Sequence, residues 1–579
     1  MNQLTASAAI ASGRVQLASV RQRSLVTAKL RVLVVAVGFV FLSLVALVRL
    51  TQLGLFEQAP DRRSLAEALL PPRGEITDRN GIPLARAFPS YSLWFNPKAL
   101  GENGNPLVKT PEEVARALIQ IFPDADFKDL VSRLKSGKGS YLRKRVLPEE
   151  ANRVFALGEP ALEFPRENQR YYPQGSLAAN VLGYVDEEGK GHVGMEQVLE
   201  PRLLDPAQRG TPVALSIDSR AQGALEDELL RGMQESNAKG AAGIVLDVDS
   251  GEVVALASLP SFNPNRSDRA FNDLVFNRVS NQVYELGSTF KPITVAAAID
   301  AGVVTDLSVR YPTAPLHIAG RTIHDSHNFG ASLNVPEALI HSSNIVTAQV
   351  ADKLGGPLLR QTMMALHMNQ RPTIELPARG FPLWPHGENK AGDWSRITTM
   401  TVSYGHGIAV TPLHLACAYA ALVNGGIWRP ATLFKVDPAH VPAGTRVFKA
   451  STSARLRQLL RMIVADGTGR KADASGFRVG GKTGSAEKPG NGGYRKTSLV
   501  ATFASAFPMD KPRYVVIAML DEPQGTAATS GQRTAAWNAA PIVGRVVPRI
   551  GPLLGVVPDA SRDVDISDLS PLIGSGDGE

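Results

Sequence analysis

Three short groups of polar residues occur in order along the 579-residue chain and together could carry out acyl transfer. They are Ser288-Thr-Phe-Lys291, Ser342-Ser-Asn344 and Lys482-Thr-Gly-Ser485. A serine nucleophile needs a nearby base, and a charged intermediate needs hydrogen-bond donors; these residue types supply both. Each spacing alone is weak evidence, because S-x-x-K also occurs at Ser132 and Ser485, and S-x-N occurs three more times. The interpretation therefore depends on the order and context of the groups.

The context of Ser288 predicts a helix N-terminus. Ile293 to Ala301 is an apolar run typical of a buried helix, and Pro292 is tolerated in a first turn because its missing N–H would have no intrahelical partner. Lys291 should therefore lie one turn after Ser288, facing it. A lysine can remove the serine proton if burial and nearby positive charge lower its pKa. The helix N-terminus and Lys482 would supply that positive field.

The third group lies in a predicted strand of a larger sheet. Strand-like stretches occur at residues 243–249, 252–257, 477–486, 499–507 and 514–520. Two strands, a long helical insert that carries Ser288 and Ser342, and three closing strands predict one antiparallel sheet covered by helices. Glycines 480, 481 and 484 suit a strand that another backbone approaches closely, such as a docked peptide. The alternative is a loosely packed glycine hairpin.

The N-terminus predicts a membrane anchor. Val32 to Val48 is almost wholly apolar, and Leu50 to Phe56 adds mostly apolar length. Seventeen helical residues span about 25 Å, slightly less than a hydrocarbon core of about 30 Å, so Arg49 should lie at the interface or snorkel to it. A cleaved signal peptide is the competing interpretation, but no small-residue cleavage site follows the run. Basic residues precede the run and the first acid is Glu57, which predicts a cytoplasmic N-terminus and an exported remainder. The basic residues are Arg14, Arg21, Arg23, Lys29 and Arg31.

The composition gives no support for nucleic-acid binding. The net charge is +8, but six of the 62 basic residues and none of the 54 acids lie within residues 1–56, so the remainder carries 56 basic against 54 acidic residues. The excess of positive charge is therefore a topology signal. The single cysteine, Cys417, permits no internal disulfide and is expected to be buried in an apolar helix. His324, Asp325 and His327 match no reliable ligand spacing, so we expect a polar turn there, with no metal and no cofactor.

Taken together, these motifs resemble the class B penicillin-binding proteins, and specifically the division-specific peptidoglycan D,D-transpeptidases of FtsI type. The resemblance covers nearly the whole chain and includes four further strings. They are Arg73-Gly-Glu-Ile-Thr-Asp-Arg-Asn-Gly81, Arg170-Tyr-Tyr-Pro-Gln-Gly175, Gly191-His-Val-Gly-Met-Glu196 and Tyr404-Gly-His-Gly-Ile-Ala-Val-Thr-Pro412. Ser485 is a departure, since the family more often has threonine there.

The resemblance implies a serine acyl-enzyme mechanism. Ser288 would attack the carbonyl between the two terminal D-alanines of a stem peptide, and Lys291 would accept the serine proton. Ser342 and Lys482 would relay a proton to the leaving amine, while Asn344 would hold the peptide amide and the lysine in register. The substrate-binding residues would be Thr483, Gly484 and Ser485; the hydroxyls of the first and last would bind the terminal carboxylate. The backbone N–H groups of Ser288 and Ser485 would form the oxyanion hole.

The resemblance also implies a domain organisation of α+β class. A cytoplasmic tail (1–28) would precede a transmembrane anchor (29–54), a non-catalytic α/β pedestal or dimerisation domain (55–215) and a transpeptidase domain (216–555) with a five-stranded antiparallel sheet. Residues 78–81 predict a hairpin turn, and Arg73 and Glu196 a buried ion pair that locks the pedestal. Six acids among the last 21 residues predict a disordered tail over 556–579.

The expected location is the bacterial inner membrane, with a single span and a periplasmic catalytic domain. The implied partners are peptidoglycan stem peptides, glycan strands made from lipid-linked precursors, β-lactams, a SEDS-type glycosyltransferase of FtsW type and other division proteins. An elongation-specific class B transpeptidase and a non-enzymatic division scaffold are the alternatives, although the intact catalytic set disfavours a scaffold. A serine β-lactamase is disfavoured because no E-x-x-L-N deacylation motif lies between Asn344 and Lys482.

Overall fold

The computed structural model describes residues 25–26, 28–49, 51, 71–99, 107–186, 189–266, 275–387, 392–490 and 493–573. The chain divides into two compact units, Met1–Leu70 and Pro71–Glu579. Within the described part of the first unit, the helix Ala28–Arg49 has 22 residues and is long and apolar enough to cross a membrane. At 1.5 Å per residue it spans about 33 Å, close to the thickness of a hydrocarbon core. The predicted tail before residue 25 and residues 52–56 lie outside the described residues.

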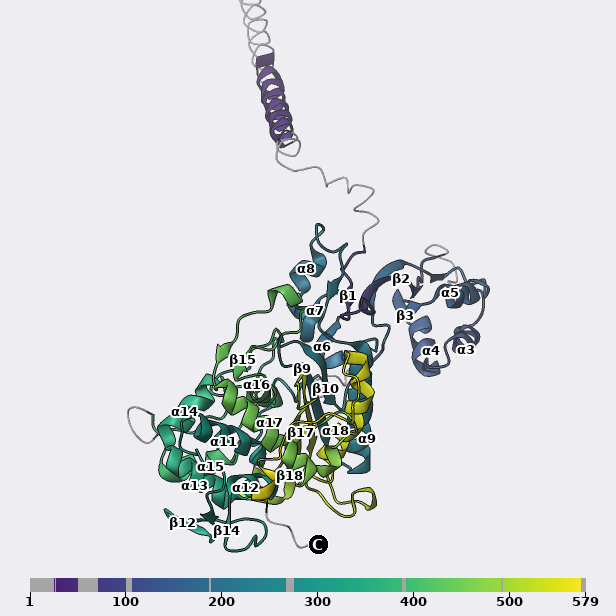
Figure 1. The fold of residues 1–579 in the computed structure, drawn as a ribbon. Helices are drawn as coiled ribbons and strands as arrows, with labels where there is room; N and C mark the ends of the chain where they lie inside the picture. The colour runs from purple at the N-terminus through teal and green to yellow at the C-terminus, as the bar shows by residue number, and fades with distance from the viewer. Residues whose placement is uncertain are drawn as a thin grey trace, which may run out of the picture. The chain divides into compact units, whose positions relative to one another are not determined.

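The second unit begins with a six-stranded sheet (Figure 1). The turn at residues 78–81 is confirmed, because Asp78 Oδ1 accepts hydrogen bonds from the backbone N–H groups of Asn80 (2.8 Å) and Ile82 (2.9 Å). The sheet strands are β1 (Ile76–Thr77), β2 (Pro83–Phe95), β3 (Ser140–Val146), β4 (Leu162–Glu163), β5 (Arg166–Tyr171) and β8 (Val213–Ala214). Helices α3 (Pro111–Ile121), α4 (Phe127–Lys135) and α5 (Pro148–Phe155) share a separate hydrophobic core with β2 and β3.

A buried ionic cluster joins the start of this unit to a helical segment. Arg73 Nε lies 2.8 Å from Glu196 Oε2, and the two side chains are 6% and 0% exposed. Arg170 Nε lies 2.6 Å from the other carboxylate oxygen of Glu196, and Tyr172 donates to that same oxygen (3.3 Å). The predicted Arg73–Glu196 pair is thus confirmed and is part of a larger network. The segment consists of α6 (Ala179–Leu182), β6 (Tyr184–Val185), β7 (Gly191–His192), α7 (Gly194–Val198) and α8 (Glu200–Leu204).

The five predicted strands of the second sheet form one antiparallel sheet in the order β10-β9-β19-β18-β17. In β9, β18 and β19 the buried apolar residues alternate between two different hydrophobic cores, as the period of two requires. Helices α9 (Ser219–Glu235) and α18 (Ala539–Ile550) pack on one face, and α11 (Lys291–Asp300), α16 (Pro412–Val423) and α17 (Ala450–Ala465) on the other (Figure 1). The strands are β9 (Gly240–Asp247), β10 (Val253–Leu259), β17 (Gly480–Gly490), β18 (Gly493–Phe507) and β19 (Tyr514–Asp521).

The insert between β10 and β17 carries most of the remaining helices. They are α12 (Val335–Ile340), α13 (Asn344–Leu354), α14 (Gly356–Ala365) and α15 (Arg396–Ser403). Short strand pairs join them: β11 (Tyr311–Pro312) with β14 (Ser332–Leu333), β12 (Leu316–Ile318) with β13 (Arg321–Ile323), and β15 (Ile427–Trp428) with β16 (Thr445–Arg446). Single 3-10 turns lie at η1 (Gly287–Phe290), η2 (Pro438–His440), η3 (Arg470–Ala472), η4 (Ala527–Thr529), η5 (Pro552–Leu554) and η6 (Ser570–Leu572). Cys417 is buried in α16 as expected.

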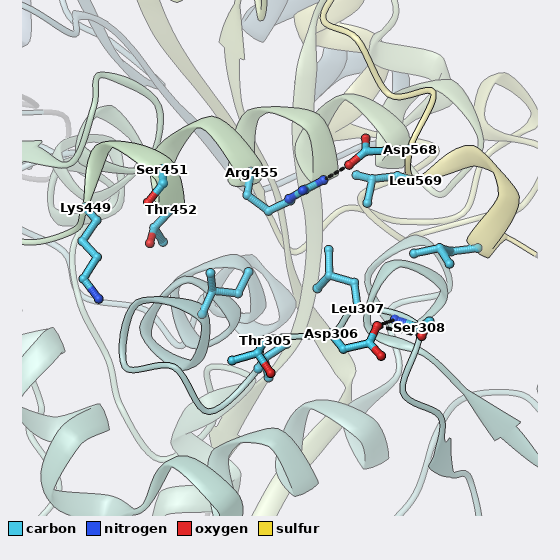
Figure 2. Close-up of a pocket in the computed structure, with 13 residues that line it drawn as sticks. Thr305, Asp306, Leu307, Ser308, Lys449, Ser451, Thr452, Arg455, Asp568 and Leu569 are labelled. Atoms are coloured by element: carbon cyan, nitrogen blue, oxygen red, sulfur yellow. Dashed lines mark hydrogen bonds and ion pairs between the residues drawn. The ribbon is translucent and has the colours of Figure 1, made fainter.

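The prediction of a disordered C-terminal tail is wrong for residues 556–573, which pack against the sheet domain. Figure 2 shows Arg455 of α17 beside Asp568, at 2.5 Å, and Leu569 next to them. Leu569 is only 2% exposed, and Asp563 pairs with Arg461 of α17 at 2.8 Å. Acidic composition predicted disorder, but here the acids meet basic side chains of α17. Residues 574–579 lie outside the described residues.

Candidate functional site

Ser288 lies in the 3-10 turn η1, and α11 begins at Lys291. The sequence predicted that Ser288 lies at the N-terminus of a helix. The structure differs in that Ser288 lies in a 3-10 turn, tighter than an α-helix, just before α11. The turn is held from both sides, because Thr289 Oγ1 donates to the carbonyl of Leu286 (2.9 Å) and Tyr419 of α16 donates to the carbonyl of Thr289 (2.9 Å). Ser288 itself is half-buried.

Two buried lysines converge on the hydroxyl of Ser342. Lys482 Nζ of β17 lies 2.9 Å from Ser342 Oγ, and Lys291 Nζ lies 3.2 Å from the same oxygen and also donates to the Ser342 carbonyl. Both lysines are 0% exposed. Among the hydrogen bonds of the described residues, none joins Lys291 to Ser288 Oγ; such bonds often form only when substrate binds. The structure thus brings together Lys291, Ser342 and Lys482 from three separate elements.

The backbone of Ser342 is held in a left-handed conformation, with φ of +63°. A side chain other than glycine adopts this region at a cost of about 1–3 kcal/mol, and such residues cluster at functional sites. Ser342 lies between α12 and α13, in a turn that points its hydroxyl at both amino groups. The local conformation therefore positions the shared hydroxyl.

The electrostatic surroundings favour the neutral forms of Lys291 and Lys482. Burial lowers the pKa of Lys482 to about 7. Burial, and then the charge of Lys482, lower the pKa of Lys291 well below its usual value, while the carboxylate of Asp325 acts in the opposite direction. Burial, and then the charge of Lys291, also lower the pKa of His406 to about 4, so this imidazole is neutral near pH 7. A lysine with a lowered pKa can serve as a general base near neutral pH.

Asn344 is the first residue of α13, and its surroundings differ in part from the prediction. Its side-chain amide donates to the carbonyl of His324 (3.1 Å), and its backbone N–H donates to Asp325 Oδ1 (2.5 Å). The sequence predicted that Asn344 would hold a lysine in register, whereas the described hydrogen bonds tie it to residues 324 and 325. Asp325 is therefore a site residue that sequence reasoning missed, because its motif was read as a polar turn.

The edge strand β17 presents the other predicted substrate residues. Thr483 Oγ1 hydrogen-bonds Thr468 Oγ1 (2.8 Å), and Ser485 Oγ accepts the backbone N–H of Ala535 (2.9 Å). Thr468 and Ala535 were also missed, since no short motif marks them. Gly484 lies between these two residues, and a Cβ there would meet the Leu286 carbonyl at 2.4 Å. The sequence predicted that another backbone approaches this glycine closely. In the structure, that backbone is the turn before Ser288 in the same chain.

A serine on a turn against an edge strand, with two buried lysines on a second serine, defines a serine acyltransferase of the penicillin-binding type. The model of the penicillin-binding protein transpeptidase domain matches residues 241–543, and that of the penicillin-binding protein dimerisation domain matches residues 68–209. The chain belongs to the class B penicillin-binding proteins of FtsI type.

The relatives agree with this assignment. The chain is 38% identical over 512 residues to the probable peptidoglycan D,D-transpeptidase FtsI of Caulobacter vibrioides, with 87% of this chain and 85% of the relative covered. It is 30% identical over 542 residues to the peptidoglycan D,D-transpeptidase FtsI of Escherichia coli K12, with 90% of each covered. The fold matches penicillin-binding protein 3 of Mycobacterium tuberculosis in complex with aztreonam, at a TM-score of 0.65 and 24% identity, over 86% of this chain and 99% of that one.

Proposed function

We propose that this chain is a D,D-transpeptidase that cross-links peptidoglycan stem peptides at the division septum through an acyl-enzyme on Ser288, and that β-lactams inhibit it. The observation that carries the proposal is the convergence of Lys291 and Lys482 on Ser342 beside the Ser288 turn. A hydroxyl that accepts from two buried amino groups is arranged for moving protons, and an apolar core alone would not need it.

In the first half of the reaction, Ser288 Oγ attacks the carbonyl carbon between the two terminal D-alanines. Lys291 takes the hydroxyl proton, which its lowered pKa permits, because a larger fraction of it is neutral near pH 7. The C–N bond then breaks, and Ser342 and Lys482 pass a proton to the departing amine. D-Alanine leaves, and the acyl group remains as an ester on Ser288.

The negative oxygen formed in this step needs donors already in place. The backbone N–H groups of Ser288 and Ser485 would supply them, and the loss of one such donor typically costs about 2.7 to 4 kcal/mol. Thr483, Gly484 and Ser485 would bind the C-terminal end of the donor peptide, with the two hydroxyls on its carboxylate. Gly484 packs against the Leu286 carbonyl, which supports a close approach of β17 to the Ser288 turn. Asn344 would contact the peptide amide.

In the second half, an amine of a neighbouring stem peptide attacks the ester. Its proton passes to the lysine pair, the C–O bond breaks, and the hydroxyl of Ser288 is restored. The product is a cross-link between two glycan strands. Such strands come from lipid-linked precursors, so a SEDS-type glycosyltransferase of FtsW type and other division proteins are the expected partners. The pedestal, proposed as residues 55–215, would lift the transpeptidase domain (216–555) from the membrane and present contact surfaces.

The proposed location is the inner membrane. The basic residues before the helix Ala28–Arg49 favour a cytoplasmic N-terminus, with both folded domains in the periplasm. The elongation-specific transpeptidase is the second candidate, and the relatives called FtsI favour division. Depletion of the protein separates the two, since loss of a septal enzyme gives filaments and loss of an elongation enzyme gives round cells.

The chemistry is tested by labelling with a fluorescent penicillin. We expect one covalent adduct, mapped by mass spectrometry to Ser288 and lost in Ser288→Ala. Ser132→Ala is a matched control, because Ser132 has a lysine at the same spacing but lies on α4, outside the transpeptidase match. An adduct on any other residue, or labelling that persists in Ser288→Ala, contradicts the proposed mechanism.

A further inference from the structure

Asp325 lies between β13 and β14 and binds the N-terminus of α13 with both carboxylate oxygens. Its Oδ1 accepts the backbone N–H groups of Asn344 (2.5 Å) and Ile345 (3.1 Å), and its Oδ2 accepts the hydroxyl of Ser343 (2.6 Å). Ser343 in turn accepts the backbone N–H of Val346 (3.1 Å). A half-buried carboxylate therefore satisfies donors that the first turn of a helix leaves unpaired, where the helix dipole also favours negative charge.

These bonds fix the residue that the two lysines share. Ser342 directly precedes Ser343, and its left-handed backbone must be held by its neighbours. With Ser343, Asn344 and Ile345 tied to Asp325, the carbonyl and hydroxyl of Ser342 face Lys291 and the hydroxyl also faces Lys482. Asp325 thus acts on the lysine pair through Ser342.

Asp325 also acts on the pair by its charge. The titratable groups that face Lys291 in the described structure are Lys482 from β17, His406 from the turn after α15, and Asp325 from the segment after β13. Burial and Lys482 disfavour the charged form of Lys291, and His406 is neutral near pH 7. Asp325 is the group among these that opposes that trend, so its carboxylate partly offsets the positive charge of the two lysines.

We propose that Asp325 is a positioning residue for acylation, which holds the Ser342–Asn344 turn and supplies the counter-charge that keeps one proton available on the Lys291–Lys482 pair. The inference rests on the proposed function and extends it, because it assigns a role to a residue outside the three motif groups. It predicts two separable effects, one on geometry and one on charge.

The test is the second-order rate constant of acylation by benzylpenicillin, measured with the full-length protein in detergent between pH 5 and pH 9. Because the base must be neutral to accept the serine proton, the rate falls on the acid side as the lysines protonate. Asp325→Asn removes the negative charge, so the lysines protonate less readily and the acid limb should move to lower pH by about one unit. The plateau should fall about tenfold or more, because the turn is less well held.

A second variant separates geometry from charge. Ser343→Ala removes one hydrogen bond to Asp325 and leaves the carboxylate, so its plateau should fall while its acid limb stays at the wild-type pH. Asp306→Asn is the matched control, since Asp306 also accepts a backbone N–H and a hydroxyl, both from Ser308, but lines the pocket of Figure 2, whose lining includes neither Lys291 nor Lys482. It should change neither quantity.

The outcomes distinguish this inference from the proposed function. If the wild type is not acylated at Ser288, both fail. If the wild type is acylated and folded Asp325→Asn keeps the acid limb at the wild-type pH, the inference is overturned and the proposed function stands. Should Asp325→Asn not fold, Asp325→Ser replaces it, because a hydroxyl can accept a backbone N–H without carrying a charge. If the acid limb of the pH profile of Asp325→Ser stays at the wild-type pH, the inference is overturned in the same way.

Discussion

The substitution Arg73→Ala should destabilise the pedestal without directly touching the chemistry. Arg73 is 6% exposed and makes four contacts: with the carboxylate of Glu196, with the backbone carbonyls of Glu196 (2.9 Å) and Gly189 (3.2 Å), and with Glu200. Glu200 is 25% exposed, so water can replace part of what it loses. Glu196 is 0% exposed and depends on protein partners alone.

The magnitude follows from what remains around Glu196. Removing one partner of a buried ion pair typically costs about 3–5 kcal/mol. Arg170 would still lie 2.6 Å from the carboxylate, so the charge is not left wholly unpaired, which favours the lower end of that range. The lost packing of the arginine stem adds to the cost. We therefore expect about 3–4 kcal/mol, which corresponds to a fall in melting temperature on the order of 10 °C if a domain of the size proposed for the pedestal (residues 55–215) unfolds by itself.

The assay is thermal unfolding of the full-length protein in detergent, with limited proteolysis to locate the segment that opens first. Early cleavage should fall within the pedestal, and acylation by fluorescent penicillin should remain measurable below the transition. Glu112→Gln is the control, because the ion pair of Glu112 with Lys135 is exposed and screened by water, so its loss should leave the melting temperature almost unchanged. A melting temperature within 2 °C of the wild type would refute the structural role of Arg73. Loss of acylation in folded Arg73→Ala would instead show that the pedestal and the active site are coupled.

Three further predictions concern the transpeptidase domain. Lys291→Ala and Lys482→Ala should each abolish acylation by penicillin, the first by removing the base and the second by removing the relay; near wild-type labelling of folded Lys482→Ala would disprove its role. In the wild type, the rate of acylation should be highest at alkaline pH and should decline as the pH falls through about 7. The reason is that burial lowers the pKa values of the two lysines, which become protonated as a coupled pair. A pH-independent rate between pH 6 and 8 would contradict this prediction. Deletion of residues 559–579 should destabilise the domain by about 3 kcal/mol, mostly because the buried contacts of Leu569 with the rest of the domain are lost, as measured by chemical denaturation. An unchanged midpoint would show that the segment contributes little.

Local patterns in the sequence predicted much of the fold. Periodicity and turn chemistry within a short stretch of sequence were enough to predict three features. They are the five strands of the second sheet, the hairpin at residues 78–81 and the burial of Cys417. The Arg73–Glu196 pair joins residues 123 apart, and it was found because both lie in strings that resemble the family.

Residues recruited by the tertiary fold could not be predicted in this way. Asp325, Thr468 and Ala535 reach the site from loops, and nothing in the sequence around each of them marks it as a site residue. The C-terminal segment was misjudged for a related reason. Composition reports whether a segment could fold alone, whereas residues 556–573 order against basic side chains of α17 that lie about a hundred positions earlier in the chain.

The order in which the chain is made has a consequence for when the enzyme can first act. Strand β9 pairs with β19, and the carbonyl of Leu572 accepts the side-chain amide of Asn334, which caps the helix that leads into Ser342. Ser288 and Ser342 are therefore synthesised long before the strands and the terminal segment that support them. A nascent chain that has not yet reached β19 would carry its nucleophile without the sheet that supports the site. The site would be fully supported only after β19 and the segment around Leu572 are made, so a shorter nascent chain would be a poor target for acylation by substrate or drug.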